Sequence, residues 1–248
     1  ELSKNGVMNA GKNSMILGLR GIPNQSEDVM VARDIMLAEL TSGRLHIAHV
    51  STAGSVELVR QAKKKGLNVT CETCPHYFTL TDDAVKTYDT NYKMNPPLRR
   101  QKDVDAVKEG LADGTIDCIA TDHAPHTFED KNKEFDLAPF GIIGFETLLS
   151  LVLNELVDKK VLSFQDAIAK MTVNPAKIFS LEKRGSLAVG SIADITIIDT
   201  EYSYEYKKEN ILSKSKNSPF IGRKFKGGAV MTIVGGKIAW SQKDGIIN

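Results

Sequence analysis

The chain has 248 residues, and its 32 Lys and Arg residues nearly balance 31 Asp and Glu residues, which gives a net charge of +1. This length suits one large or two modest domains, and a composition of 42% hydrophobic and 25% charged residues is ordinary for a globular protein. The near-neutral charge argues against nucleic-acid binding, no apolar run approaches the ~20 residues of a membrane span, and three cysteines do not make a disulfide framework, so we expect a cytoplasmic protein.

Three apolar segments in the first two-thirds of the chain have the pattern of buried strands, and helical segments separate them. The strands are expected at residues 45–52, 68–74 and 115–122. Strands and helices in this alternation imply parallel pairing and an α/β fold. Two further helices are expected, from residue 144 to about 160 and from residue 163 to about 181.

The last quarter of the chain has a different pattern, which predicts a small β unit. Residues 192–199 form an expected strand, and residues 229–240 an expected hairpin. Gly235 and Gly236 mark its turn, because glycine adopts the positive φ that such turns need. The segment between, residues 201–226, is polar and lysine-rich, so we expect it to be exposed.

Titratable side chains gather where the expected strands end, and in parallel α/β folds these ends carry function. Asp122 ends the third strand, and His123 and His126 follow within four residues. An acid at this position can bind a metal or accept a proton; a structural Asp that caps the next segment is the alternative. His49 lies near the end of the first strand, where a buried, hydrogen-bonded histidine is an equally good interpretation. His46, three residues earlier on that strand, is expected to face the opposite side.

Residues 93–99 predict a rigid loop, because two adjacent prolines fix φ and remove backbone donors. Within this loop Asn95 offers one acceptor and two donors, which suit an amide or imide edge, although a turn-forming Asn is the alternative. Cys71 and Cys74 match a C-x-x-C pattern but lie in a strand without a second pair, so we expect no metal or redox role. We expect His76 to be structural.

Taken together, these motifs resemble the dihydroorotases, most closely the type I enzymes among the metal-dependent amidohydrolases. The form of the proline loop favours dihydroorotases over the related hydantoinases and allantoinases. The segments that carry the resemblance are His49-Val50-Ser51-Thr52, Pro75-His76, Met94-Asn95-Pro96-Pro97-Leu98-Arg99, Thr121-Asp122-His123-Ala124-Pro125-His126 and Pro139-Phe140-Gly141.

The resemblance implies a zinc enzyme of de novo pyrimidine biosynthesis that reversibly cyclises N-carbamoyl-L-aspartate to dihydroorotate. It also implies a (β/α)8 barrel with one or two zinc ions at the carboxyl ends of its strands, and a homodimer. The implied roles are metal ligand for His49, metal ligand and catalytic acid/base for Asp122, and substrate contacts for Asn95, His126, Phe140 and Gly141.

The chain departs from the family in lacking a His-x-His-x-Arg motif and a fifth-strand histidine ligand. Its three barrel strands match the sixth to eighth, so residues 1–183 resemble part of a barrel and residues 184–248 part of a small β-sandwich. The start at Glu1 is neither a signal peptide nor a methionine start. We therefore expect a fragment, inactive alone, whose remaining zinc ligands lie upstream of Glu1.

Two other functions stay open at this point. A non-catalytic dihydroorotase-like protein that binds a partner such as aspartate transcarbamoylase would account for the missing first-strand motif. Another cyclic amidohydrolase, of the hydantoinase or allantoinase type, would use the same kind of site. The joint presence of Asp122, His126 and Asn95 favours an enzyme, because a non-catalytic protein has no chemical need for all three residues.

Overall fold

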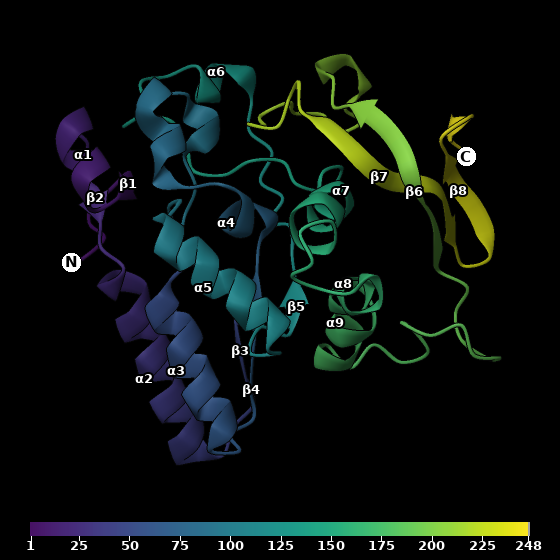
Figure 1. Cartoon of the computed structure of the whole chain (residues 1–248), viewed down its shortest axis with the longest axis horizontal. Coiled ribbons are helices and arrows are strands. Elements are labelled where there is room, and N and C mark those ends of the chain that lie inside the picture. The colour runs from purple at the N-terminus through teal and green to yellow at the C-terminus, as the bar shows by residue number, and fades with distance from the viewer. Residues whose placement is uncertain (248) are drawn as a thin grey trace.

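The computed structural model describes residues 1–247, and a parallel sheet of three strands lies at its centre (Figure 1). The strands are β3 (Leu45–Ile47), β4 (Val69–Thr73) and β5 (Cys118–Ile119), in the order β3-β4-β5. Their number, order and parallel direction confirm the α/β prediction. A second, two-stranded parallel sheet, β1 (Met8–Asn9) with β2 (Gly21–Ile22), was not expected from the sequence.

The central strands are shorter than predicted because the backbone turns sharply near their carboxyl ends. His49 has a φ of 58° and Asp122 a φ of 48°, which is the left-handed region that breaks a β ladder. One hydrogen bond continues the pairing beyond β3, from the Val50 N–H to the Glu72 carbonyl at 2.9 Å. The two turned residues are thereby held just past the sheet edge.

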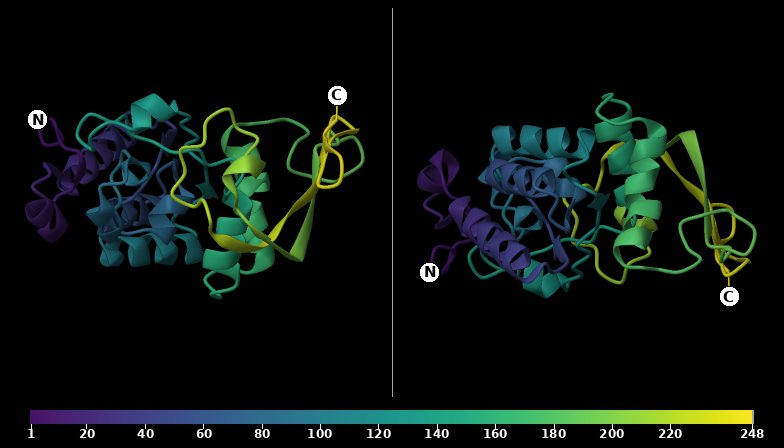
Figure 2. Two further views of the ribbon diagram at one scale, coloured as in Figure 1. Left: turned by 90° about the horizontal axis from the view of Figure 1, so that it is seen from above. Right: turned by 90° about the horizontal axis from the view of Figure 1, so that it is seen from below.

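Three helices cover one face of the central sheet (Figures 1 and 2). They are α2 (Gln25–Thr41), α3 (Ala53–Lys64) and α5 (Gln101–Ala112), and α3 contacts both of the others. Their apolar side chains join those of the strands in the main core, whose buried members include Val31, Val56, Val59, Cys71, Val107, Leu111 and Ile119. Because strand side chains alternate, Glu72 and Cys118 face the opposite side of the sheet.

The two helices expected between residues 144 and 181 are both interrupted. The first is α7 (Leu148–Val152), continued by the π-helical turn η3 (Leu153–Val157). The second is divided into α8 (Phe164–Met171) and α9 (Val173–Ile178), because Pro175 cannot donate a hydrogen bond to the preceding turn. The remaining short helices and turns are α1 (Lys12–Leu17), α4 (Pro75–Thr79), η1 (Asp82–Thr87), η2 (Thr90–Tyr92), α6 (Phe128–Lys131) and η4 (Lys208–Asn210).

The C-terminal β unit lies at the opposite end of the molecule from the N-terminus (Figures 1 and 2). It is an antiparallel sheet of β6 (Ile195–Glu205), β7 (Lys224–Val234), β8 (Lys237–Ser241) and β9 (Gly245–Ile246). The predicted hairpin is confirmed, with φ values of 56° and 82° at its two turn glycines.

The prediction that residues 201–226 are exposed is correct for residues such as Glu201, Lys207 and Lys226 but wrong for the apolar residues of the segment. Tyr206, Ile211, Phe220 and Phe225 from this segment are buried, and they pack with Ile142, Ile143 and Leu151 in a second core cluster. Through this cluster the β unit packs against the chain segment that follows Asp122. Within residues 1–247, none of the helices combines the length and apolar character needed to cross a membrane.

Candidate metal and substrate site

The side chains of His49 and Asp122 meet just beyond the carboxyl edge of the central sheet. His49 Nε2 lies 3.7 Å from Asp122 Oδ1, and both side chains are about one-third exposed, at 32% and 34%. Two ligand atoms on one tetrahedral zinc ion are separated by roughly 3.3 Å, so this spacing fits joint coordination. The donor types, an imidazole nitrogen and a carboxylate oxygen, also suit zinc, although a catalytic zinc usually has three protein ligands and this pair offers two.

Glu72 of the central strand β4 holds the other side of the His49 ring. Its Oε1 lies 3.2 Å from His49 Nδ1, and its Oε2 lies 3.4 Å from His46 Nε2. The expectation that His46 and His49 face opposite sides is therefore wrong, because His49 lies beyond the strand in a left-handed conformation. Thr70 Oγ1 lies 2.8 Å from the remaining nitrogen of His46, and the same hydroxyl donates to the Leu45 carbonyl at 3.3 Å.

These contacts shift the protonation of the three groups. The hydrogen bond to Glu72 raises the pKa of His49 above its usual value against the opposing effect of burial, and the charge of Asp122 adds to the increase. Burial disfavours ionisation of Glu72, but hydrogen bonds from His46 and His49 outweigh it and lower the pKa of Glu72 to about 2. Glu72 is thus an anion that binds two imidazole rings.

The proline loop that carries Asn95 is anchored to the same edge of the sheet. Arg99, which is 2% exposed, donates to Ser51 Oγ at 3.2 Å, to Asn9 Oδ1 at 3.1 Å and to the Ile22 carbonyl at 2.9 Å. Tyr77 donates its hydroxyl hydrogen to the Pro96 carbonyl at 2.7 Å. The side chain of Asn95 itself is exposed. These bonds fix the backbone of the loop, and the Asn95 side chain is in contact with solvent.

His126, Phe140 and Gly141 lie together in the segments that follow Asp122. His126 Nε2 is 2.8 Å from the Phe140 carbonyl oxygen, and the Gly141 N–H donates to the Lys93 carbonyl at 2.9 Å. Gly141 has a φ of 112°, and a Cβ at this position would lie 2.5 Å from the Cβ of Ala124, so only glycine fits. The bond to Lys93 ties this segment to the loop of Asn95, which follows two residues later.

Several residues that were not predicted from the sequence form hydrogen bonds that fix the segments of the site. Glu27 of α2 accepts hydrogen bonds from the backbone N–H groups of Ser51 and Thr52, at 2.9 and 3.2 Å, and so fixes the segment after His49. Lys93 and Lys131 are buried, and their ammonium groups bind the backbone before and at Gly141. Glu72 could have been found as a carboxylate within an otherwise uncharged strand. The buried lysines carry no such signal, because lysine is usually exposed.

The cysteines and His76 are packed into the interior. Cys71 belongs to the main core, whereas Cys74 Sγ lies 3.6 Å from His49 Nδ1. Burial lowers the pKa of His76 to about 3, and its ring packs on Tyr77 with centroids 4.2 Å apart. Among the described residues, His46, Glu72 and Cys118 also form a group whose donor atoms lie within 4.8 Å of one another, and Glu72 links this group to His49.

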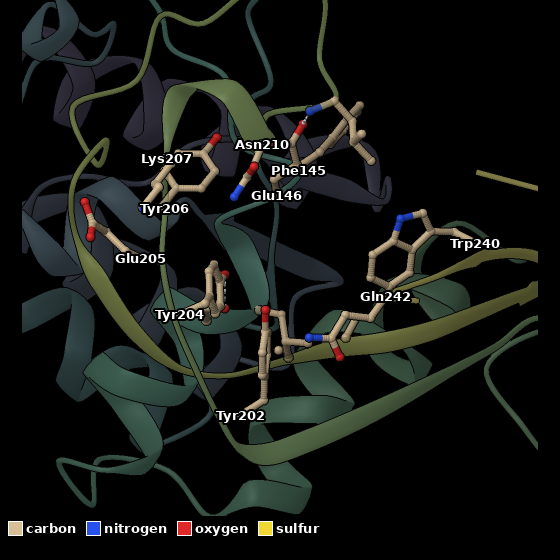
Figure 3. A pocket seen from close by; sticks show the side chains of 15 residues that line it. Phe145, Glu146, Tyr202, Tyr204, Glu205, Tyr206, Lys207, Asn210, Trp240 and Gln242 are labelled. Carbon is tan, nitrogen blue, oxygen red and sulfur yellow. Dashed lines mark hydrogen bonds between the residues drawn. The ribbon is translucent and has the colours of Figure 1, made fainter. Parts of the chain in front are cut away.

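A separate cavity of about 350 Å³ lies between α7 and the β unit (Figure 3). Aromatic side chains dominate its lining, and Figure 3 shows the rings of Tyr202, Tyr204 and Tyr206 along one wall, with Trp240 opposite. Phe145 belongs to this lining, and its ring stacks on His123 with centroids 3.8 Å apart. The cavity therefore adjoins the segment after Asp122 but contains neither His49 nor Asp122.

Comparisons with known proteins show the family of this chain. The profile of the amidohydrolase family matches residues 23–239. The chain is 80% identical to a dihydroorotase of Endomicrobium trichonymphae over 97% of its own length and 57% of that protein, and 58% identical to a dihydroorotase of Geotalea daltonii over 94% and 54%. It thus spans little more than half the length of these curated relatives.

Solved structures show the same relationship. An L-hydantoinase from Arthrobacter aurescens superposes with a TM-score of 0.84 at 33% identity, and a dihydropyrimidinase from Brevibacillus agri with a TM-score of 0.85 at 28% identity. In both cases the match covers 90% of this chain and 50% of the other. By its family profile, its relatives and its fold, the chain belongs to the amidohydrolase family.

Proposed function

We propose that this chain is the C-terminal part of a zinc-dependent dihydroorotase, which interconverts N-carbamoyl-L-aspartate and dihydroorotate. The observation that carries the proposal is the 3.7 Å approach of His49 Nε2 and Asp122 Oδ1 at the ends of β3 and β5. Hydrogen bonds join the segments of Asn95, His126 and Phe140 just after this pair. Relatives that are named dihydroorotase support this reaction.

In this proposal β3, β4 and β5 are the sixth, seventh and eighth strands of a (β/α)8 barrel. Parallel pairing in chain order, with helices on one face, supports this assignment. Residues 1–183 would then form part of the barrel, and residues 184–248 part of the accompanying β-sandwich. The remaining zinc ligands would lie upstream of Glu1, and the complete protein would form a homodimer.

His49 and Asp122 would hold the zinc ion, which when bound polarises the ring amide carbonyl and makes water a stronger nucleophile. Asp122 then moves the proton. In ring opening its carboxylate accepts a proton from the attacking water and delivers it to the ring nitrogen that leaves. In ring closure the same carboxylate removes the proton from the carbamoyl nitrogen as that nitrogen bonds to the carboxyl carbon, and it delivers the proton to the carboxyl oxygen that leaves as water. One group serves both directions because the path of the proton is the same in reverse.

The substrate carboxylate and imide would be bound by the segments after the strands. The amide of Asn95 offers both donors and an acceptor for the imide edge. His126 Nε2 is engaged by the Phe140 carbonyl, so Nδ1 is the ring atom left for the substrate. A contact from Nδ1 to a carboxylate needs a proton on that nitrogen. The backbone N–H of Phe140 is the third donor of this group.

A cyclic amidohydrolase of the hydantoinase type is the second candidate, because the hydantoinase from Arthrobacter aurescens is similar over 90% of this chain. The test uses the full-length protein, with zinc content measured by elemental analysis. Hydrolysis is then compared for dihydroorotate, hydantoin and dihydrouracil. We expect bound zinc and a kcat/KM for dihydroorotate at least ~100-fold above the others, because a carboxylate-binding site rejects rings without that group. A preference for the uncharged rings would support the second candidate, and a zinc-free, inactive protein would reject both.

A further inference from the structure

Two buried ammonium groups bind most of the backbone carbonyls in the loop that leads to Phe140 and Gly141. Residues 135–141 contain no helix and no strand, so these carbonyls have no ladder partners. Lys93 comes from the proline loop and Lys131 from the end of α6, and together they donate five hydrogen bonds to this loop. The acceptors of Lys93 are the carbonyls of Phe135 at 2.7 Å, Asp136 at 3.0 Å and Ala138 at 2.7 Å, and those of Lys131 are the carbonyls of Pro139 at 3.0 Å and Gly141 at 3.1 Å.

The burial of these two lysines is unusual for their residue type. Lys93 is 2% exposed and Lys131 is 6% exposed, whereas lysine side chains are almost always in contact with water. Lys93 Nζ also lies 4.7 Å from the centre of the Phe140 ring, a favourable cation–π arrangement. Burial lowers the pKa of both groups, that of Lys131 to about 8 with a further contribution from the charge of Lys93. Removing two ammonium groups from water is unfavourable in free energy, so their hydrogen bonds to the loop must offset the lost hydration.

The five bonds fix the orientation of the peptide planes on both sides of Phe140. A trans peptide directs its carbonyl and its N–H to opposite sides. Because Lys131 holds the Pro139 carbonyl, the Phe140 N–H points away from Lys131. The next carbonyl, that of Phe140, is bound by the His126 ring at 2.8 Å. The Gly141 N–H is held by the Lys93 carbonyl, so no polar backbone group around Phe140 can turn freely.

We propose that Lys93 and Lys131 are positioning residues that preorganise the Phe140 segment for an anionic cyclic amide; the identity of that substrate rests on the function proposed above. The lysines do not touch the substrate. They act through the backbone, by holding the Phe140 N–H and the ring of His126 in one arrangement before the substrate arrives. Their two positive charges also make this side of the site favourable for a substrate carboxylate.

The test compares Lys131→Met with a matched control, Lys170→Met, in the full-length zinc enzyme. Lys170 is also 6% exposed, and its ammonium group donates to a backbone carbonyl, that of Ile116, at 2.6 Å, but in a different part of the fold. Lys131→Met removes the donor to the buried Pro139 carbonyl and leaves the Gly141 carbonyl with the 3.2 Å bond from Asn217 Nδ2. We therefore expect the KM for dihydroorotate to rise by about tenfold while kcat changes by less than about twofold. Lys170→Met should lower the melting temperature without changing KM.

Amide hydrogen exchange of residues 134–142, measured without substrate, gives a readout that does not depend on activity. Exchange should accelerate in Lys131→Met and in Lys131→Gln, with a smaller effect in Lys131→Gln because its amide can still bind one carbonyl. It should not accelerate in Lys170→Met. Unchanged exchange and KM in a folded Lys131→Met protein, or an equal KM change in Lys170→Met, would overturn the inference. If the wild-type protein does not hydrolyse dihydroorotate, the proposed function fails, and the exchange result still decides whether the lysines order the loop.

Discussion

The replacement Glu72→Gln tests whether the carboxylate behind His49 prepares that ring to bind zinc. Glutamine has the same shape but no charge, and its amide cannot accept hydrogen bonds on both ends from His46 and His49. A histidine that binds metal through Nε2 needs its proton on Nδ1, where a carboxylate acceptor holds it. In this structure Glu72 Oε1 lies 3.2 Å from that atom.

The size of the effect follows from the hydrogen bonds of Glu72. The two histidines lower its pKa from 4.5 to about 2, which corresponds to about 3 kcal/mol. Because Glu72 also binds His46, only part of this free energy acts on His49, and we expect the zinc affinity to fall by roughly tenfold or more. Losses of ~10–100-fold are typical when the carboxylate partner of a metal-binding histidine is removed.

The assay is competition for zinc between the full-length protein and a chelator of known affinity, with the melting temperature measured in parallel. Glu57→Gln is a suitable control, because Glu57 is a half-exposed carboxylate on α3 that pairs with Arg60. It should bind zinc as the wild type does. A Glu72→Gln protein that is fully folded and retains wild-type zinc affinity would refute the view that Glu72 orients His49.

Three further replacements have distinct expected outcomes. Asp122→Asn removes the proton acceptor but keeps an oxygen ligand, so we expect a folded, zinc-containing protein with activity reduced by about 10²–10⁴-fold; retention of most activity would assign the proton transfer to another group. Asn95→Ala should weaken dihydroorotate binding by about 1–3 kcal/mol without loss of zinc, and loss of metal would make its role structural. For Lys131 the folded-state pKa of about 8 lies below the unfolded value near 10.5. Between these values only the unfolded chain holds this proton, so the contribution of Lys131 to the free energy of unfolding should increase from pH 8 to 10.5. The slope of that free energy against pH, measured by urea unfolding, should therefore be more positive in wild type than in Lys131→Met; equal slopes would contradict the burial argument.

Some parts of the fold follow from local sequence, and others depend on tertiary contacts. Alternating apolar segments predicted the three parallel strands, but their ends were set by left-handed residues at His49 and Asp122, for which the sequence has no glycine to signal the turn. The polar, lysine-rich composition of residues 201–226 predicted that this segment is exposed. The widely spaced apolar residues within it, such as Ile211 and Phe220, have no helical or strand period and are buried only because Ile142 and Leu151 pack against them.

Some features of the candidate site likewise follow from local sequence, and others depend on tertiary contacts. His49 and Asp122 were predictable as a pair, since both lie where strands end and parallel strands end at one edge. The link between His46 and His49 was not, because it passes through Glu72 on the neighbouring strand. Lys93 and Lys131 belong to a residue type that is usually exposed, and only the three-dimensional course of residues 135–141 shows what they bind.

The position of bound zinc decides whether His49 and Asp122 share one metal ion. Crystals of the full-length protein, measured above and below the zinc absorption edge, would give an anomalous difference peak at each zinc ion. We predict a peak at roughly 2.0–2.2 Å from both His49 Nε2 and the carboxylate of Asp122. A fully zinc-loaded protein whose only peaks lie elsewhere, for example between His46, Glu72 and Cys118, would show that His49 and Asp122 are not the zinc ligands.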